Sequence, residues 1–546
     1  MPARRSPENR PTGVVLLVVL VVIALLSIVN LAYYDWTFAE RKAADAATRQ
    51  EQALLAAESA VEMLKLYLSE EPTSIEQDGG LWSNPGRFRA MLIADGVEPE
   101  LRVRASVVAP MWGPLRLEGA RFGLEDDSGR LNLNTLLVAE TRQEGAARDQ
   151  LMALPGMTEA IADAILDWLD DDDTPRTLGA ERDYYSTQTP PYAPANGPLA
   201  TIEQLLLVKD VTPELLWGVD VNRNAVADTA EVAGVPLPVD NSTGALDGGW
   251  ASMLTLYSAE ANVQPDGTPK INVNADDLEQ LHADIAGLLG EGAANFVVAF
   301  RQGGPEDSPD DDQAGLSAGG GGQAPPPSDS GGGGPSNGPL PTKAPESIQV
   351  DFDTPAAVAV QDLFELVGVT VRVVEKGELS PTLVESPWQE ASGTVANGLT
   401  DLMQTLTTTD AESIPGRVNI NTAPRPVLAG VPGMPLEAVD AILASRDPAA
   451  GSTRIDRLHA SWLLAEGYLD LETMRDIAPY VTGQGAVYRA QVVGGYEAGG
   501  PVRRLEVVLD TTASPPRIAL RRDLSPLGAG FDPALTLSPT EQPIAP

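Results

Sequence analysis

Hydrophobic residues are concentrated at the N-terminus, where residues 14–29 form a run of sixteen positions without a charged side chain. Extended to Tyr34, the run covers about 21 residues, or roughly 30 Å of helix, which is enough to cross a bilayer. Arg4, Arg5 and Arg10 precede it, and this charge asymmetry predicts a cytoplasmic N-terminus with the bulk of the chain across the membrane. The competing interpretation is a secretory signal, whose apolar core is shorter and ends in a small-residue cleavage site.

An amphipathic pattern continues directly from the apolar run. From Thr37 to about Leu68 the chain holds no Gly or Pro, and apolar residues recur at helical spacings of three, four and seven. The sequence therefore predicts one long helix that projects from the membrane. Its outer half must pack on the chain's own globular domain or on neighbouring copies.

Beyond this helix, short segments with β-branched residues and alternation predict strands. They lie at Leu101 to Pro110, Arg116 to Leu124, Tyr488 to Leu509 (a hairpin) and Arg517 to Arg522. A phrase with Asn at alternate positions occurs three times, as RLNLNT from residue 130, KINVNA from residue 270 and RVNINT from residue 417. We expect a structural role for these amides, as caps of the turn or helix that follows each phrase.

Two of the Asn phrases are followed by a second shared phrase. LPGM at 154–157 precedes TEAIADAIL, and VPGM at 431–434 precedes PLEAVDAIL. Gly156 and Gly433 permit a tight turn, and Thr158 and Pro435 are good first residues for the next helix, so these are helix-hairpin-helix-like units. Such hairpins can present N–H groups to DNA phosphates, but the acidic flanks here argue against that use and favour helix packing.

The segment after the first hairpin holds most of the candidate chemistry. Seven carboxylates lie between Asp167 and Asp183, against only Arg176 and Arg182. Carboxylates this close repel one another unless a cation lies between them, and flexible oxygen-rich loops suit Ca²⁺. The spacing is not that of an EF-hand. On composition alone, a solvated acidic loop is the alternative.

Composition narrows the possible functions. Lys and Arg number 37 against 77 Asp and Glu, a net charge of −40 that disfavours binding to nucleic acid. Cysteine is absent, which excludes disulfides and thiolate zinc sites. The two histidines, His282 and His459, lie far apart without an HExxH pattern, and no nucleophile or base is framed by a second group. We therefore predict that the protein is not an enzyme.

The N-terminal segment resembles the precursor of a type IV pilin-like protein. It combines a short basic leader, Gly13 and an uninterrupted apolar helix, and in such precursors prepilin peptidase cuts after the glycine, which would leave Val14 as the first residue. Most pilins and pseudopilins carry a glutamate at the fifth mature position, where this chain has Val18. The absence of that glutamate is typical of one minor pseudopilin, general secretion pathway protein K of the type II secretion system. An uncleaved signal anchor has the same hydropathy and is the alternative.

Residues 154–185 and 190–218 closely resemble the inserted α-domain of the same secretion protein K. In that family the Asp-Trp-x-Asp-x-Asp-Asp segment and the Gly-Ala-Glu-x-Asp-Tyr-Tyr segment lie at calcium sites. The resemblance implies Ca²⁺ as a cofactor, with candidate ligands Asp170, Asp172, Asp173, Glu181 and Asp183. It also implies packing and hydrogen-bonding roles beside the loop for Tyr184, Tyr185 and Tyr192.

The predicted fold class is α+β. It has a long transmembrane, pilin-like helix, an antiparallel pilin-type sheet and a large inserted α-helical domain that contains the hairpin units. LTLYS at 254–258 and KINVNA resemble the point of return to the sheet, and the resemblance extends to about residue 300. The predicted divisions are a prepilin leader (1–13), the pilin helix (14–70), first strands (71–135), the inserted α-domain with the acidic loop (136–250), a return segment (251–301), a disordered linker (302–346), a second α/β region with the hairpin repeat (347–480), closing strands (481–522) and a tail (523–546).

The resemblance implies a minor pseudopilin at the tip of the type II secretion pseudopilus, which aids pseudopilus assembly and protein export across the outer membrane. It implies a single span in the inner membrane with a periplasmic bulk. The implied partners are the I-type and J-type minor pseudopilins, the major pseudopilin and prepilin peptidase, without nucleic acid. Val18 fits a tip position, because the glutamate that it replaces is thought to neutralise the buried N-terminal amine of the subunit above. The alternatives are a membrane-anchored helix-hairpin-helix scaffold, a DNA-uptake or pilus-like component, and an anchored hydrolase.

Overall fold

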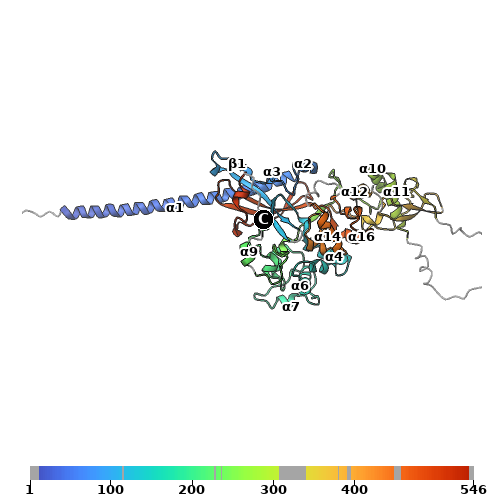
Figure 1. The fold of residues 1–546 in the computed structure, drawn as a ribbon, viewed down its shortest axis with the longest axis horizontal. Coiled ribbons are helices and arrows are strands. Elements are labelled where there is room, and N and C mark those ends of the chain that lie inside the picture. The colour runs from blue at the N-terminus through green and yellow to red at the C-terminus, as the bar shows by residue number, and fades with distance from the viewer. Residues whose placement is uncertain are drawn as a thin grey trace, which may run out of the picture.

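The computed structural model describes residues 12–113, 116–226, 229–234, 236–306, 340–378, 380–389, 395–447 and 457–539. Most of the predicted leader and linker, and the end of the predicted tail, lie outside these ranges. The first element is the helix α1 (Thr12–Tyr67), so the predicted single long helix is confirmed. By length and composition α1 can cross a membrane, and its most apolar window is not buried in the protein. Its first half extends alone from the globular part (Figure 1).

The outer half of α1 packs on one face of a seven-stranded antiparallel sheet. The strands are ordered β1-β2-β16-β17-β18, with β3 paired to β2 and β4 paired to β16. The predicted strands and the C-terminal hairpin are confirmed. Their bounds are β1 (Met91–Ala94), β2 (Val103–Trp112), β3 (Leu117–Phe122), β4 (Glu125–Asp126), β16 (Val487–Tyr496), β17 (Val502–Asp510) and β18 (Arg517–Asp523).

Small residues let α1 lie close to the centre of the sheet. Ala53, Ala57 and Ala60 on the helix are fully buried. Gly494 on β16 lies against them, and a Cβ at this position would stand 2.6 Å from the backbone nitrogen of Ala57, closer than real Cβ contacts come. The glycine is therefore required by the approach of the helix, and larger side chains such as Leu64 fill the core on either side.

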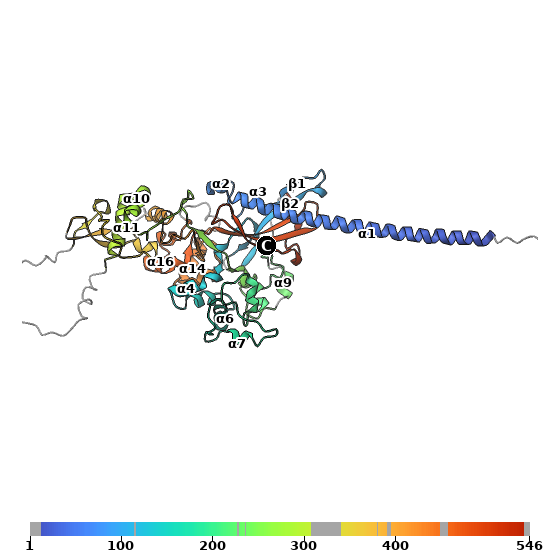
Figure 2. The ribbon, with the colours of Figure 1, turned by 180° about the vertical axis from the view of Figure 1, so that it is seen from behind.

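Alternation along the central strands gives the sheet two different faces. Val492, Leu505 and Val507 belong to the apolar core under α1. Their neighbours Gln491 and Glu506 point to the other face, where Gln491 donates a hydrogen bond to a carbonyl of the inserted helical domain. The sheet is thus enclosed between α1 and the inserted domain, and the two views of the ribbon agree on this arrangement (Figures 1 and 2).

The inserted domain is helical and leaves the sheet after β4. Its elements are α4 (Leu136–Arg142), α5 (Ala146–Met152), α6 (Glu159–Leu169), α7 (Arg182–Tyr185), the 3₁₀ helix η4 (Ile202–Leu207), α8 (Pro213–Trp217) and α9 (Thr229–Gly234). The α+β class with an inserted α-domain is therefore confirmed. The expected return to the sheet within 251–301 is wrong, because the strands of that segment pair elsewhere and the chain re-enters the sheet only at β16.

The three Asn phrases open three copies of one structural unit. Each phrase forms a two-residue strand that pairs in parallel with a later two-residue strand, and in each pair an Asn stands opposite a Thr. The pairs are β5 (Leu131–Asn132) with β6 (Leu254–Thr255), β8 (Ile271–Asn272) with β12 (Leu406–Thr407), and β14 (Val418–Asn419) with β15 (Val481–Thr482). We refer to these units as the first, second and third repeats.

The amides of the repeats act as caps, as predicted. In every copy the first Asn accepts a hydrogen bond from the backbone N–H two residues later, at 3.1, 2.9 and 2.9 Å for Asn132, Asn272 and Asn419. The second Asn of each phrase forms hydrogen bonds with the backbone of a loop that is distant in sequence. Asn134 donates to and accepts from the backbone of Leu199, and Asn274 does the same with Val360. Each repeat is therefore closed by side-chain bonds as well as by a strand pair.

The second and third repeats extend away from the free half of α1, with α10 and α11 at the far end (Figure 1). Gly156 and Gly433 adopt positive φ angles of 72° and 80° between paired helices, as the turn prediction requires. The remaining elements include α10 (Leu278–Leu289), α11 (Glu291–Gly303), β9 (Thr342–Lys343), β10 (Thr370–Val374), β11 (Pro381–Glu385), α12 (Val395–Thr405), α13 (Arg425–Ala429), α14 (Leu436–Ser445), α15 (Trp462–Ala465) and α16 (Leu471–Ile477). Another strand pair, β7 (Ala259–Ala261) with β13 (Ser413–Pro415), joins the segments between repeats.

Candidate functional site

The acidic loop begins at the C-terminal end of α6. Thr158 caps this helix, and its hydroxyl accepts a hydrogen bond from the backbone N–H of Ile161 at 3.3 Å. The aspartate face of α6 is buried as completely as its apolar face, because Asp163 is fully enclosed by the loop. Asp163 pairs with Arg148 and accepts a hydrogen bond from the backbone N–H of Leu178 at 3.1 Å. The loop therefore folds back over the helix instead of extending into solvent.

Asp167 holds the second half of the loop. This carboxylate is fully buried and accepts hydrogen bonds from the backbone N–H of Ala180 and from Arg176 Nη1, both at 2.8 Å. Gly179 lies directly over it, and a Cβ there would collide with Asp167 Oδ2. The loop conformation thus depends on a glycine at this position, and the buried charge is balanced by an arginine and two backbone donors.

Glu181 has an unusual environment for a carboxylate. The residue is only 3% exposed, and neither side-chain oxygen has a hydrogen-bond partner among the described residues. Burial raises the pKa of Glu181 to about 7, and the charges of Asp167, Asp170, Asp173 and Asp172 raise it further in that order. A buried, unpaired carboxylate among other acids is costly unless a cation balances it.

Asp170 shares this environment. One of its oxygens pairs with Arg176, while Oδ1 is buried without a partner in the described structure. Burial raises the pKa of Asp170, against the lowering effect of Arg176. Asp170 and Glu181 therefore both direct unsatisfied oxygens into the same acidic region.

The other predicted ligands are placed differently. Asp172 accepts a hydrogen bond from the backbone N–H of Thr174 at 2.6 Å, and Asp173 pairs with Arg182 at 3.4 Å. Asp183 lies exposed in the first turn of α7, and it is not among the acids that raise the pKa of Glu181. The loop thus brings Asp170, Asp172 and Asp173 near Glu181 and leaves Asp183 at the surface.

Asn196 joins the loop and was not singled out from the sequence. Its Nδ2 donates to the backbone oxygen of Asp172 at 2.6 Å and to Asp173 Oδ1 at 3.2 Å. Its Oδ1 is buried without a partner among the described residues, and its φ of 44° is in the left-handed region that Asn tolerates. Nothing in the sequence marks this Asn as a residue with positive φ, and the only available signal is an Asn beside a Gly after a proline-rich stretch.

The unpartnered oxygens of the acidic loop have the chemistry of calcium ligands but not the geometry of a formed metal site. Within the described ranges, no group of three or more His, Cys, Asp or Glu side chains is arranged to hold a metal ion. The donor chemistry fits Ca²⁺ nevertheless, because both oxygens of Glu181 and one each of Asp170 and Asn196 are buried carboxylate or amide oxygens without partners. Such an ion would neutralise the charge that burial makes unfavourable, and Asp170 and Glu181 would hold it.

The tyrosines beside the loop pack together, as predicted. Tyr185 is fully buried, and its ring lies edge-on to Trp168 with centroids 5.2 Å apart. Tyr184 and Tyr192 contact Tyr185 at centroid distances of 5.2 and 5.3 Å. Tyr192 also donates to the carbonyl of Leu207 at 2.8 Å. The aromatic group therefore packs beside the loop and helps to hold its second half.

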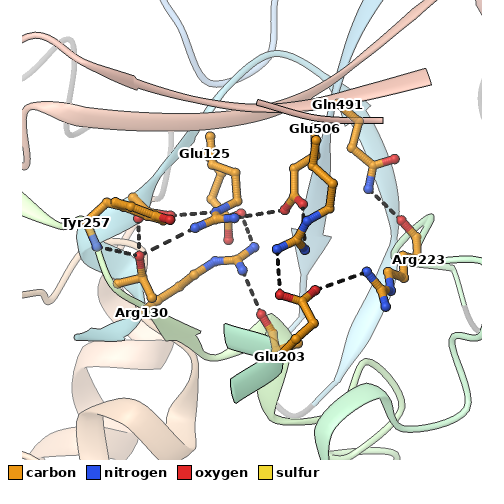
Figure 3. Close-up of polar contacts among 12 residues, drawn as sticks. Glu125, Arg130, Glu203, Arg223, Tyr257, Gln491 and Glu506 are labelled. Carbon is orange, nitrogen blue, oxygen red and sulfur yellow. Dashed lines mark hydrogen bonds and ion pairs between the residues drawn. The ribbon is translucent and has the colours of Figure 1, made fainter. Parts of the chain in front are cut away.

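A chain of ion pairs connects the inserted domain to the sheet, and no pattern in the sequence predicts it. Figure 3 shows Glu506 reaching from the sheet toward Glu203 of the inserted domain. Arg489 joins Glu506 at 2.8 Å, Arg522 joins Glu506 at 3.3 Å and Glu203 at 2.8 Å, and Arg223 joins Glu203 at 3.5 Å. We call these five residues the interface cluster. Four of them, Arg223, Arg489, Glu506 and Arg522, border a cavity of about 100 Å³ between the two layers.

A sharp turn next to the interface cluster is built around Asp220. This residue is 6% exposed, and its carboxylate accepts hydrogen bonds from the backbone N–H groups of Asn224 and Ala225 at 3.0 and 2.8 Å. Burial raises the pKa of Asp220 to about 6 despite these two donors. The turn presents two backbone oxygens to the sheet, where Arg504 and Gln491 donate to them at 2.5 Å each.

The architecture defines a class of protein. A long N-terminal apolar helix whose outer half packs on an antiparallel sheet, with a helical domain inserted between strands, describes a membrane-anchored protein of the pilin-like kind. The inserted domain allows a more specific comparison. Residues 129–218 match the family model described as type II secretion system (T2SS), protein K. This part of the chain is therefore similar to protein K of the type II secretion system, as the resemblance in the sequence implied.

Two further comparisons give the extent of the similarity. The chain is 40% identical over 60 residues to "Putative type II secretion system protein K" of Escherichia coli (strain K12). This match covers 11% of the chain and 18% of the relative's length. The crystal structure of the GspK-GspI-GspJ complex from the enterotoxigenic Escherichia coli type 2 secretion system matches with a TM-score of 0.32 and 10% identity, over 89% of this chain and 98% of that chain.

Proposed function

We propose that this protein is a minor pseudopilin that occupies the tip of the type II secretion pseudopilus and helps to start its assembly. The placement of the repeats relative to α1 carries the proposal. The free half of α1 extends from one end of the molecule, while α10 and α11 lie at the opposite end (Figure 1). In a stack of subunits joined through their α1 helices, such bulk beyond the sheet obstructs a subunit above, so the top position suits this chain.

The surface of α1 supports the same role. Its apolar half carries Val18 where most pseudopilins have a glutamate, so it offers no carboxylate there for the N-terminal amine of a higher subunit. Outside the membrane segment, Leu55, Met63 and Leu66 on α1 are 57%, 43% and 71% exposed. Large apolar side chains that are exposed together on one helix indicate an interaction surface. The proposed partners for it are the I-type and J-type minor pseudopilins, with the major pseudopilin below.

Cross-linking tests the tip position directly, because the chain has no cysteine of its own. One variant carries Met63→Cys on the outer half of α1, and a matched variant carries Leu288→Cys on α10, which is comparably exposed at 57%. Each is co-expressed with cysteine-substituted partner pseudopilins and oxidised in cells. We expect disulfide-linked products from position 63 and none from position 288. A product between position 288 and any pseudopilin would place a subunit above this one and overturn the tip proposal.

Maturation by prepilin peptidase belongs to the same proposal. The predicted cleavage bond between Gly13 and Val14 lies in the first turn of α1. The test is the intact mass and N-terminal sequence of the membrane-extracted protein, with and without co-expressed peptidase. A chain that begins at Val14 only with the peptidase supports the pathway, a single inner-membrane span and a periplasmic bulk. A chain that keeps residues 1–13 in both cases would leave a membrane-anchored scaffold.

Calcium binding by the acidic loop is also proposed, with Asp170, Asp172, Asp173, Glu181 and Asp183 as the candidate ligands. The unpartnered buried oxygens of Glu181 and Asp170 support it most. Equilibrium dialysis of the full-length protein with ⁴⁵Ca²⁺ provides the measurement. We expect Glu181→Gln to weaken binding by about tenfold or more, since it removes a charged ligand. The control is Asp440→Asn on α14, an exposed aspartate at 62%. Equal affinity in both variants would refute the assignment.

A further inference from the structure

A cavity of about 60 Å³ lies where the second and third repeats meet. Its lining comes from segments far apart in sequence, including β7, the residue before β8, β12 and the residues before α15. The ionisable side chains at its wall are Glu260, Lys270, Asp362, Arg417 and His459. We call it the inter-repeat cavity. It is remote in sequence from the acidic loop, and the proposed secretion role does not use it.

Two cations at this wall share a single carboxylate. Lys270 Nζ lies 3.7 Å from Glu260 Oε1, and Arg417 Nη1 lies 3.4 Å from Glu260 Oε2. The three side chains are 7%, 24% and 12% exposed for Lys270, Arg417 and Glu260. Burial acts to raise the pKa of Glu260, but Arg417 and then Lys270 outweigh it and lower the pKa. Burial lowers the pKa of Lys270, against the raising effect of Glu260. With both cations charged, these three residues carry one positive charge more than their single carboxylate balances.

The other two ionisable side chains of the cavity wall, Asp362 and His459, form no ion pair with Lys270 or Arg417 in the described structure. Asp362 also lines the cavity, and its carboxylate is engaged as a cap that accepts from the backbone N–H of Phe364 at 2.8 Å. Burial raises the pKa of Asp362, against the lowering effects of this hydrogen bond and of Arg417. Burial, with help from Lys270, lowers the pKa of His459 to about 3, so its ring is neutral and can donate from one nitrogen.

Several hydrogen-bonding groups at the cavity have no partner among the described residues. They include Arg417 Nε and His459 Nε2, both of which are buried. Asn262 Oδ1 on the same wall is also buried and unpartnered. A buried guanidinium N–H without an acceptor costs stability comparable to a lost hydrogen bond to a charged group. Water could satisfy these groups, and the volume suffices for a few molecules, but water leaves the extra positive charge in place.

We propose that the inter-repeat cavity binds one small monovalent anion, of the size of chloride or formate, between Arg417 Nε, Lys270 Nζ and His459 Nε2. The anion neutralises the second cation and supplies the missing acceptor. Because Lys270 opens the second repeat and Arg417 opens the third, the bound anion connects the two repeats. It contributes to their relative position in the way that a buried ion pair would.

The chain contains only two histidines, and this makes a direct measurement possible. Full-length protein in detergent is labelled with [ε1-¹³C]histidine, which gives one ring signal for His459 and one for His282. His282 bonds Asn295 at 2.8 Å on α11, away from the cavity lining, and serves as the internal reference. Gluconate is replaced stepwise by chloride, and in a parallel series by formate, at constant ionic strength.

We expect the His459 signal to shift and saturate while the His282 signal stays constant. A response to both anions, or to formate alone, supports the site and reports its size preference. Absence of a saturable shift with either anion overturns the proposal in favour of water alone. Arg417→Gln should weaken the response by about tenfold, since a hydrogen bond to a charged group contributes roughly that much. Arg425→Gln, which changes a half-buried arginine on α13, is the matched control and should leave the response unchanged.

If Arg417→Gln fails to fold, Lys270→Met gives a second test. This variant keeps the apolar part of the side chain and removes the cation that lies beside Glu260. With only Arg417 left, the cluster is neutral, and we expect the anion response of His459 to be lost while the protein remains folded. A full response in Lys270→Met would show that the excess charge does not attract the anion, and the proposal would be wrong.

Discussion

Replacing Asp220 by Asn tests whether the buried, ionised carboxylate of Asp220 lowers the stability of the folded protein at neutral pH. The carboxylate is buried, and its pKa in the folded protein is raised from 3.8 to about 6. A rise of about two units corresponds to roughly 3 kcal/mol of differential stability between the two protonation states. Asn keeps the shape of the side chain and one acceptor oxygen for the N–H groups of Asn224 and Ala225 but cannot ionise.

The direction of the effect follows from linkage. Below the unfolded-state pKa, near pH 4, Asp220 is protonated in both states and its contribution to stability is fully present. As the pH rises through the folded-state pKa of about 6, the unfolded chain has already lost its proton and the folded chain must lose it at a cost. The free energy of unfolding of the wild type, minus that of Asp220→Asn, should therefore fall by about 3 kcal/mol between pH 3 and 7.5.

The assay is urea unfolding of both full-length proteins in detergent, followed by tryptophan fluorescence at several pH values. The difference between the two proteins cancels the titration of every other group. Asp440→Asn, which changes an exposed carboxylate, controls for the loss of a charge and should differ from the wild type by less than about 1 kcal/mol at each pH. A difference between wild type and Asp220→Asn that stays constant across the range would refute the reasoning.

Three further outcomes are expected. Gly494→Ala forces α1 away from the sheet and should lower the free energy of unfolding by about 2 kcal/mol, whereas Gly287→Ala, in open space on α10, should raise it by about 1 kcal/mol; equal effects would contradict the packing argument. Gly179→Ala should weaken calcium binding in dialysis, because its Cβ displaces Asp167 and with it the loop; unchanged affinity would separate the loop from the ion. Arg522→Gln leaves two partly buried carboxylates without their shared cation, and we expect faster proteolysis within the inserted domain, with an unchanged rate as the contradicting result.

Features with a local cause could be predicted from the sequence. The length of α1 follows from an uninterrupted helical pattern, and the capping role of the Asn phrases follows from a side chain that reaches the N–H two residues later. The positive φ of Gly156 follows from the PGM phrase between two helical patterns. The acidic loop was recognised as a unit, because its carboxylates are adjacent in the chain.

Features that depend on distant partners could not be predicted. The Thr that pairs with each Asn lies far along the chain in an ordinary short phrase, so the three parallel pairs had no visible signature. Asp163 and Asp167 look like a solvated helix face, and only the fold of the loop over α6 buries them. The interface cluster joins residues more than 300 positions apart, such as Glu203 and Arg522. Unpartnered oxygens, such as those of Glu181, are visible only once every neighbour is placed.

The contact between α1 and β16 constrains the order in which the protein can fold. The hydroxyl of Tyr496 on β16 donates a hydrogen bond to Gln52 on α1, 444 residues earlier in the sequence. The strand β2 also pairs with β16, so the centre of the sheet cannot form before β16 is made. The helix and the first strands leave the ribosome early, while the strand that covers them is made near the end. Through most of synthesis, the small apolar face of α1 therefore lacks β16 and β17, and only β1 and β2 are available to pack on it. During that interval, a chaperone or a neighbouring subunit can bind the face that the finished molecule buries.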